Sequence, residues 1–270
     1  MPFFNPTPSL SLFYTLHGPD TAPPLILVHG WCCNSHDWDF HIPLLSQTYR
    51  VIAFDHRGHG QSSAPTDIQY RIKDYASDIV ALLHHLQYDK DVVMVGHSLG
   101  GLLASFLSVT QKDLIRAFVL VDPFYWTVEG MVKIMSGAFE ATGGDVLGVT
   151  LQFFPNLYGD SIPEWMKTWY LRRVEETPTY VIRQLAEGTQ EEHTGMSMAE
   201  HLRLRKESKV PRLVVYSSEE DAEKEKGLGM REGDKVVVMG GVGHWPHHAK
   251  ADEFNETLGS WLKNMEASRE

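Results

Sequence analysis

Ser98 stands in a segment whose residue types suit an activated nucleophile. Residues 96–101 read Gly-His-Ser-Leu-Gly-Gly, which fits the pattern G-x-S-x-G. The segment follows an aliphatic run at 92–95 and opens a helical pattern at 99–109. Small neighbours allow a sharp turn that strains the backbone at the serine and exposes its hydroxyl. Because the helix N-terminus offers N–H groups to a developing negative oxygen, this turn predicts acyl-transfer chemistry.

His244 is the candidate base for this serine. A serine hydroxyl is a weak nucleophile until a neighbouring base takes its proton. His244 lies in the glycine-rich loop 240–246, after a strand pattern at 235–239 and before a helical pattern at 252–265. Most of the 14 histidines must be structural or surface residues. The place of His244 in the order of elements nevertheless suits an imidazole that reaches back to Ser98.

The elements that must position these two residues alternate along the chain. Short aliphatic or β-branched runs typical of buried strands occur at 25–28, 51–54, 92–95, 117–121, 213–216 and 235–239. Helical spacing of apolar residues separates several of them, for example at 74–86 and 99–109. Parallel neighbours need such crossover connections. We therefore predict an α/β fold with a mostly parallel central sheet and helices on both faces.

The segment 123–205 interrupts this alternation. It holds no strand pattern and is rich in aromatic residues, and Pro155, Pro163 and Pro178 divide it into short helical pieces. The sequence thus predicts a core made of 1–122 and 206–270, with a helical insertion at 123–205. Most of its aromatic residues are expected to form the small core of the insertion, since isolated helices need buried faces to persist.

The overall composition excludes several classes of function. Lys and Arg number 24 against 35 Asp and Glu, a formal charge of −11, so we expect no nucleic-acid partner. The only cysteines, Cys32 and Cys33, are neighbours and cannot form an ordinary disulfide with each other, which favours a reducing compartment. The first residues lack the pattern of a signal peptide. With no apolar stretch near the roughly 18 to 20 residues that span a bilayer, we expect a cytoplasmic protein.

The chain resembles the α/β-hydrolase superfamily over residues 11–265. The matching pieces are His29-Gly30 after the first buried strand, the segment 55–62, the Ser98 turn and the His244 loop. The resemblance implies that the backbone N–H groups of Trp31 and Leu99 form an oxyanion hole. It also implies that 55–62 is a structural turn and that 123–205 is a cap that roofs the active site.

The acid of the implied catalytic triad has two candidates. Family members usually place an Asp after the strand that here is 213–216, but the turn reads Ser-Ser-Glu-Glu-Asp without a glycine. Glu220 occupies the usual slot, and Asp221 comes one residue later. A minority of the superfamily keeps its acid after the strand that here ends at 121, where Asp122 stands. We favour Asp122 and keep Glu220 as the alternative, because either carboxylate can orient the imidazole.

Several side chains near these turns are predicted to contact a substrate. They are Cys32, His97, Phe124, Tyr125, Trp126 and Trp245. A metal site is not expected, because His244, His247 and His248 lack helical register and a carboxylate ligand. No organic cofactor is expected either.

The leading hypothesis is a serine hydrolase that cleaves a carboxylic ester or lactone of an apolar small molecule through an acyl-enzyme. The chain also resembles, more narrowly, cofactor-independent dioxygenases of the same fold that cleave quinolone rings. This similarity lies in Gly30-Trp31-Cys32, Asp122 and the loop 240–246. In those enzymes a His–Asp pair deprotonates the substrate, and the serine only helps to bind it. A third hypothesis is a receptor-like binder with residual hydrolysis. The oligomeric state stays open.

Overall fold

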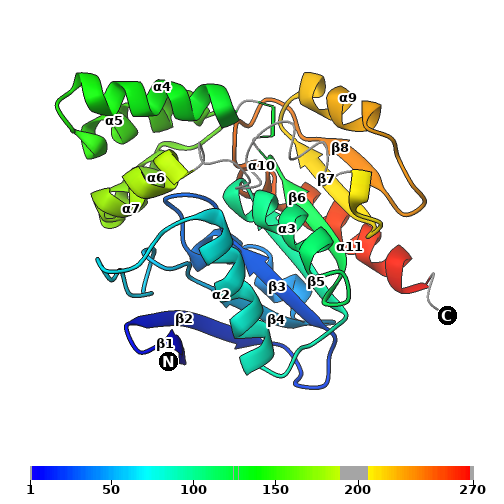
Figure 1. Ribbon diagram of the computed structural model, residues 1–270. Coiled ribbons are helices and arrows are strands. Elements are labelled where there is room, and N and C mark those ends of the chain that lie inside the picture. The colour runs from blue at the N-terminus through cyan, green and yellow to red at the C-terminus, as the bar shows by residue number, and fades with distance from the viewer. Residues whose placement is uncertain (1, 124, 127, 189–205, 268–270) are drawn as a thin grey trace.

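The protein is built around one eight-stranded sheet. The computed structural model describes residues 2–123, 125–126, 128–188 and 206–267. The strands are β1 Phe3–Thr7, β2 Leu10–His17, β3 Pro24–Val28, β4 Arg50–Phe54, β5 Val92–His97, β6 Ile115–Val121, β7 Arg212–Tyr216 and β8 Lys235–Val238. Their order is β1-β2-β4-β3-β5-β6-β7-β8 (Figure 1). All neighbours from β4 to β8 are parallel, which confirms the predicted α/β class.

Two antiparallel strands extend the sheet at its N-terminal edge. β1 pairs with β2, and β2 pairs with β4, both antiparallel. Neither strand has the sequence pattern of a buried strand. β1 contains Pro6 and is exposed or half-buried throughout, so it lacks the continuous aliphatic run that marks a buried strand.

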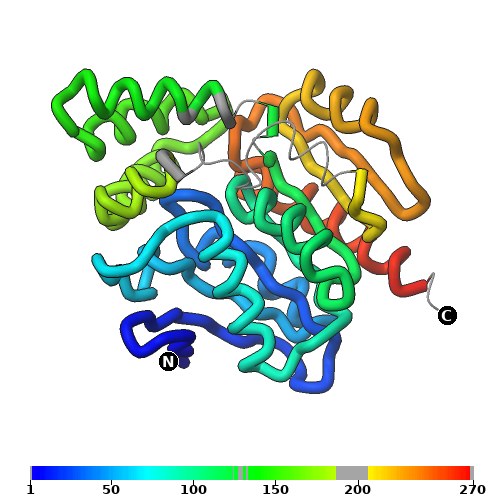
Figure 2. The backbone as a smooth tube through the Cα atoms, in the orientation of Figure 1, coloured from blue at the N-terminus to red at the C-terminus, as the bar shows by residue number. Residues whose placement is uncertain are grey.

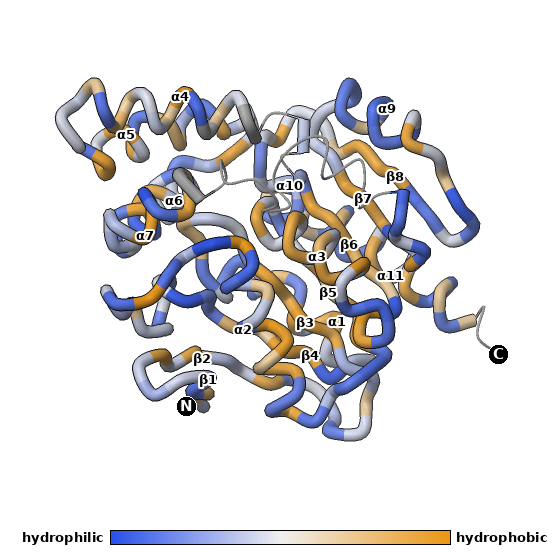
Figure 3. The backbone as a smooth tube through the Cα atoms, in the orientation of Figure 1, coloured by the Kyte–Doolittle hydropathy of each residue, from blue (hydrophilic) through white to orange (hydrophobic). Residues whose placement is uncertain are grey.

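Helices cover both faces of the sheet. The larger ones outside the insertion are α2 Ile72–His85, α3 Leu99–Thr110, α9 Glu219–Gly227 and α11 Ala251–Ala267. Shorter ones are η1 Ser35–Trp38, α1 Ile42–Leu45 and α10 Pro246–Ala249. Successive strand residues point to opposite faces, so Ile26 packs with α2 and α3 while Leu27 packs with α11. Figure 3 shows the hydrophobic residues gathered in the strands between these layers.

Helices make up most of the described chain between β6 and β7. Its described helices are α4 Val128–Ala141, α5 Val146–Phe153, η2 Phe154–Leu157, α6 Glu164–Glu176 and α7 Thr179–Gly188. The described part of 123–205 holds no strand. Phe139, Phe154, Met166 and Tyr170 belong to an apolar cluster that also includes Trp245 of the core. The tube in Figure 2 shows the green insertion helices beside the cyan and blue part of the core.

No helix among the described residues is both long and apolar enough to cross a membrane.

Candidate active site

The turn at Ser98 is as sharp as the sequence predicts. β5 ends at His97 and α3 begins at Leu99, so Ser98 alone makes the turn, with φ 52° and ψ −114°. Positive φ strains a residue that has a Cβ atom. The glycines on either side are required for close packing. A Cβ on Gly96 would lie 2.1 Å from the oxygen of Gly100, and a Cβ on Gly100 would lie 2.1 Å from the oxygen of Val28.

The loop after β3 lies directly against this turn. A Cβ on Gly30 would be 3.2 Å from the Cβ of Ser98 and 2.9 Å from Nδ1 of His97. The loop and the turn approach so closely that a side chain at position 30 would clash with His97. Leu99 is the first residue of α3, so its N–H has no acceptor within the helix. Trp31 follows Gly30, which places both expected oxyanion donors in segments next to Ser98.

His244 is hydrogen-bonded to the acid after β6. Its Nδ1 lies 2.7 Å from Oδ2 of Asp122. The other carboxylate oxygen of Asp122 accepts hydrogen bonds from the backbone N–H of Ser217 at 2.8 Å and from its hydroxyl at 2.9 Å. The carboxylate thus fixes the proton of a neutral imidazole on Nδ1, so the acceptor lone pair is on Nε2.

Backbone contacts fix the position of the His244 loop from both sides. Its N–H donates to the oxygen of Leu157 in the insertion at 2.9 Å, and its own carbonyl accepts from Nε2 of His97 at 2.8 Å. The rings of His97 and His244 have centroids 4.6 Å apart. Because His97 is bonded to Ser98 in the chain, the structure brings the predicted nucleophile and base into one neighbourhood.

Glu220, the alternative acid, has a different environment. It lies in the exposed first turn of α9 and forms an ion pair with Lys224 at 2.8 Å. Ser218 caps the helix by accepting a hydrogen bond from the N–H of Asp221. The described contacts of this turn support α9, whereas Asp122 holds the imidazole.

The predicted substrate-contacting residues divide into two groups. Trp245, which stacks on Tyr170 with centroids 4.1 Å apart, and Cys32 both pack with the insertion. Burial raises the pKa of the Cys32 thiol well above its usual range. His97 is buried beneath the Ser98 turn. These three therefore lie close to the Ser98 region or to the insertion.

Tyr125 and Trp126 pack elsewhere. Tyr125 is buried in the core cluster beside α3, with its hydroxyl on Ser105. Trp126 donates from its indole to the hydroxyl of Tyr216 at 3.3 Å. Phe124 lies outside the described residues. Contact of these side chains with a substrate stays a prediction.

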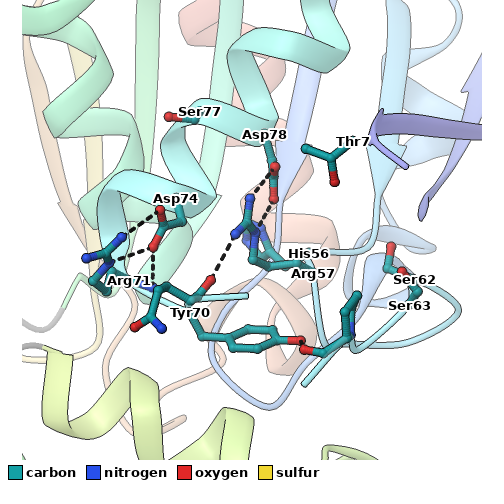
Figure 4. A network of polar contacts seen from close by, with 12 residues as sticks. Thr7, His56, Arg57, Ser62, Ser63, Tyr70, Arg71, Asp74, Ser77 and Asp78 are labelled. Carbon is teal, nitrogen blue, oxygen red and sulfur yellow. Dashed lines mark hydrogen bonds and ion pairs between the residues drawn. The ribbon is translucent and has the colours of Figure 1, made fainter. Parts of the chain in front are cut away.

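The segment 55–62 makes structural contacts. Asp55 accepts from the N–H groups of Ser35 at 2.7 Å and Gln61 at 2.8 Å. Nε and Nη2 of Arg57 donate to the two carboxylate oxygens of Asp78 in α2, each at 2.6 Å (Figure 4). These bonds fasten the turn to α2, in keeping with its expected structural role.

Two buried groups of side chains bring possible metal ligands together. They are Cys33, Asp37 and His97, and Asp37, His247 and His248. Their chemistry does not favour a metal. Asp37 is already paired with Arg173 of α6, and burial raises the pKa of Cys33, which opposes a thiolate ligand. Both ring nitrogens of His248 have other partners, namely the carbonyl of Asp37 and the hydroxyl of Tyr170.

Three residues around the site were missed by sequence reasoning: Asp37, Arg173 and Ser217. Ser217 directly follows β7 and Asp122 directly follows β6. Because these strands are parallel neighbours, their order alone could have predicted that the two residues lie side by side. The pair Asp37–Arg173 joins residues 136 positions apart and has no local signal in the sequence.

A sequence model of the family described as "alpha/beta hydrolase fold" matches residues 23–251. Among curated relatives, a serine hydrolase-like protein of Danio rerio is 32% identical over 123 residues, 45% of this chain and 37% of its own length. A non-heme haloperoxidase of Rhodococcus erythropolis is 42% identical over 102 residues, 37% of this chain and 36% of its own length. A soluble epoxide hydrolase of Corynebacterium sp. (strain C12) is 34% identical over 110 residues, which are 41% of this chain and 36% of its own length. The chain thus matches little more than a third of each relative.

Solved structures agree with the fold over nearly the whole chain. Est816, described as an N-acyl homoserine lactone degrading enzyme, has a TM-score of 0.80 at 24% identity and covers 96% of this chain and 99% of its own. The enol-lactonase from Burkholderia xenovorans LB400 has a TM-score of 0.78 at 18% identity and covers 97% of this chain and 100% of its own. At these identities the likeness establishes the architecture alone.

Proposed function

The chain belongs to the alpha/beta hydrolase fold family, and on that premise we propose that it is a serine hydrolase acting on a carboxylic ester or lactone of an apolar small molecule. The observation that carries this proposal is the pairing of His244 with Asp122 beside the strained turn at Ser98. A buried imidazole with a carboxylate on Nδ1 is equipped to accept a proton on Nε2.

In the proposed reaction, the hydroxyl oxygen of Ser98 attacks the substrate carbonyl carbon while Nε2 of His244 takes the hydroxyl proton. The N–H groups of Trp31 and Leu99 stabilise the tetrahedral oxyanion. The bond to the leaving alcohol breaks, and His244 returns the proton to the alcohol oxygen. Water then attacks the acyl-enzyme by the same route, releasing the acid and restoring Ser98. Asp122 stabilises the imidazolium in both steps.

The insertion supports an apolar substrate. We propose that segment 123–205 caps the site, with its aromatic residues next to the reacting centre. The ring centroid of Phe154 lies 6.2 Å from that of Trp31 and 6.0 Å from that of Trp245, so an aromatic ring of the insertion meets two of the core. Such a lining favours substrates with little charge. The lactone-degrading proteins of similar fold suggest lactones for the first screen.

The position of the acid also supports a second candidate. The resemblance to cofactor-independent dioxygenases rests partly on an acid after β6, and Asp122 is hydrogen-bonded to His244. In that chemistry the His–Asp pair removes a proton from a hydroxyquinolone-type substrate, whose carbanion then reacts with molecular oxygen. Ser98 would only help to bind the substrate.

The Ser98→Ala variant separates these functions. Wild-type protein, Ser98→Ala and His244→Ala are assayed on a panel of acyl esters and lactones, and oxygen consumption is measured with hydroxyquinolones. A serine hydrolase loses at least about a thousandfold in turnover with Ser98→Ala. Exposed Ser77 of α2 offers a matched control, Ser77→Ala, which should keep wild-type rates.

Two other outcomes would overturn the hydrolase proposal. Oxygen consumption that survives Ser98→Ala but collapses with His244→Ala identifies a dioxygenase. A wild-type protein that binds members of the panel but turns none of them over identifies a receptor-like binder.

A further inference from the structure

Helix α6 sends two polar side chains into the interior, against α10 and the loop that holds η1. Tyr170 and Arg173 are three residues apart, so they share one helix face, and both are buried. Arg173 donates from Nη1 to Oδ1 of Asp37, and the hydroxyl of Tyr170 donates to Nδ1 of His248 at 2.9 Å. Nε2 of His248 donates to the carbonyl of Asp37 at 2.7 Å. We call Asp37, Tyr170, Arg173 and His248 the α6 clamp.

The α6 clamp borders the residue that precedes the predicted nucleophile. Oδ2 of Asp37 lies 3.9 Å from Nδ1 of His97, too far for a hydrogen bond. Nε2 of His97 donates to the carbonyl of His244, so the lone pair of a neutral ring is on Nδ1. Burial lowers the pKa of His97 well below its usual range, which keeps the ring neutral. A carboxylate oxygen and a nitrogen lone pair, both acceptors, therefore face each other.

Arg173 stabilises this arrangement. Burial raises the pKa of Asp37, and the guanidinium of Arg173 is the strongest influence against that rise. The guanidinium is itself held over the ring of Trp169, with its central carbon 3.5 Å from the ring centroid. Arg173 thus favours the charged form of the carboxylate, which has no proton to offer His97.

We propose that Arg173 is a positioning residue for the reaction at Ser98: its ion pair keeps Asp37 from donating a hydrogen bond to His97, which leaves His97 and the carbonyl of His244 in the geometry that catalysis needs. This inference rests on the proposed hydrolase function for its kinetic consequence. Arg173 acts through Asp37 and His97 and does not itself touch the reacting atoms.

The effect of losing Arg173 follows from the distances. The unpaired, buried carboxyl takes a proton from solvent and donates it to Nδ1 of His97. A hydrogen bond of about 2.7 Å replaces the gap of 3.9 Å, which moves His97 by roughly 1 Å. The other groups facing His97 are the rings of His244 and His247, each with its centroid 4.6 Å away, and the Cys33 thiol. A displacement of about 1 Å can lower kcat about 100-fold.

The test compares two double variants that remove the same charges. Arg173→Met with Asp37→Asn leaves an amide N–H that can donate to His97, whereas Arg173→Met with Asp37→Leu leaves no donor. Removing both members of a buried ion pair usually preserves folding, so both proteins should be obtained even if Arg173→Met alone does not fold. Thermal unfolding is measured for each. Arg172→Met, at the exposed neighbouring position of α6, is the matched control.

We expect kcat on the best ester or lactone to fall about 100-fold in the Asn double variant, with KM changed less than about threefold. In the Leu double variant, kcat should stay within about tenfold of the wild-type value. The control Arg172→Met should have the kcat of the wild type. Equal kcat values in the two folded double variants would overturn the proposal, because a purely structural ion pair does not distinguish them.

A second readout does not depend on activity. Nitrogen NMR of the His97 ring should show a neutral Nε2–H tautomer in the wild type and in the Leu double variant. In the Asn double variant, Nδ1 should show the shift of a hydrogen-bonded acceptor. If no ester or lactone is cleaved, the proposed function fails, but this spectrum still decides whether Arg173 keeps Asp37 and His97 apart. An unchanged Nδ1 signal in the Asn double variant would contradict the positioning role.

Discussion

The turns after β6 and β7 lie side by side at the same end of the sheet, yet their acids have different partners. Asp122, after β6, accepts three hydrogen bonds, one from His244 and two from Ser217. Glu220, after β7, is exposed and pairs with Lys224 on its own helix. The β7 turn thus contributes Ser217 to the carboxylate of its neighbour rather than an acid of its own.

The two carboxylates differ in the hydrogen-bond donors around them more than in their distance from the end of a strand. The first turn of α9 concentrates Glu219, Glu220 and Asp221 at a helix N-terminus, where negative charge is favourable without any further role. Asp122 has positive φ, 44°, which only a specific local structure tolerates. The hydrogen bonds that converge on Asp122 are the reason why we propose it, and not Glu220, as the acid.

The largest expected effect comes from Asp122→Asn. The amide can donate to Nδ1 of His244 and so place the imidazole proton on Nε2, which blocks the base. In the corresponding variant of serine proteases this tautomer error lowers kcat about 10⁴-fold. We expect a loss of similar order in kcat for the best ester or lactone, measured at pH 7 with unchanged thermal unfolding. A loss below about tenfold would mean that another acid orients His244.

Ser217→Ala should have a smaller effect. The variant removes one of the two hydrogen bonds from Ser217 to Asp122 and keeps the backbone one. Hydrogen bonds to charged groups contribute about 1.5–3 kcal/mol, which corresponds to a loss of about 10- to 150-fold in kcat/KM. Ser218→Ala, which removes the α9 cap instead, is the control. If both serine variants lower kcat/KM equally, Ser217 has no special relation to the acid.

The smallest effect is expected for Glu220→Gln. The substitution removes an exposed ion pair and no contact of His244, so kcat/KM should stay within about twofold of wild type. A large loss here, with Asp122→Asn nearly silent, would reverse the comparison and assign the catalytic acid to the turn after β7.

The sequence predicts the scaffold better than the charges packed inside it. Long aliphatic runs such as 92–95 identify buried strands because both faces of a parallel sheet are covered. β1 cannot be recognised in this way, because an exposed strand at the sheet edge needs no aliphatic run. The turn at Ser98 was visible because the glycines around it leave a local signature.

Contacts between distant segments leave no such signature. The choice between Asp122 and Glu220 depends on which turn supplies hydrogen-bond donors, which follows from how β6 and β7 are placed. The ion pair of Arg173 with Asp37 depends on how α6 packs on η1, a tertiary arrangement that neither segment encodes locally.

The activation of Ser98 by His244 is tested most directly by covalent labelling of the folded protein with a fluorophosphonate, followed by mass spectrometry of the modified peptide. We expect one label per chain, on Ser98, formed in the wild type and greatly slowed in both His244→Ala and Asp122→Asn. No label on Ser98, or labelling whose rate is indifferent to His244, would contradict an activated serine at this turn.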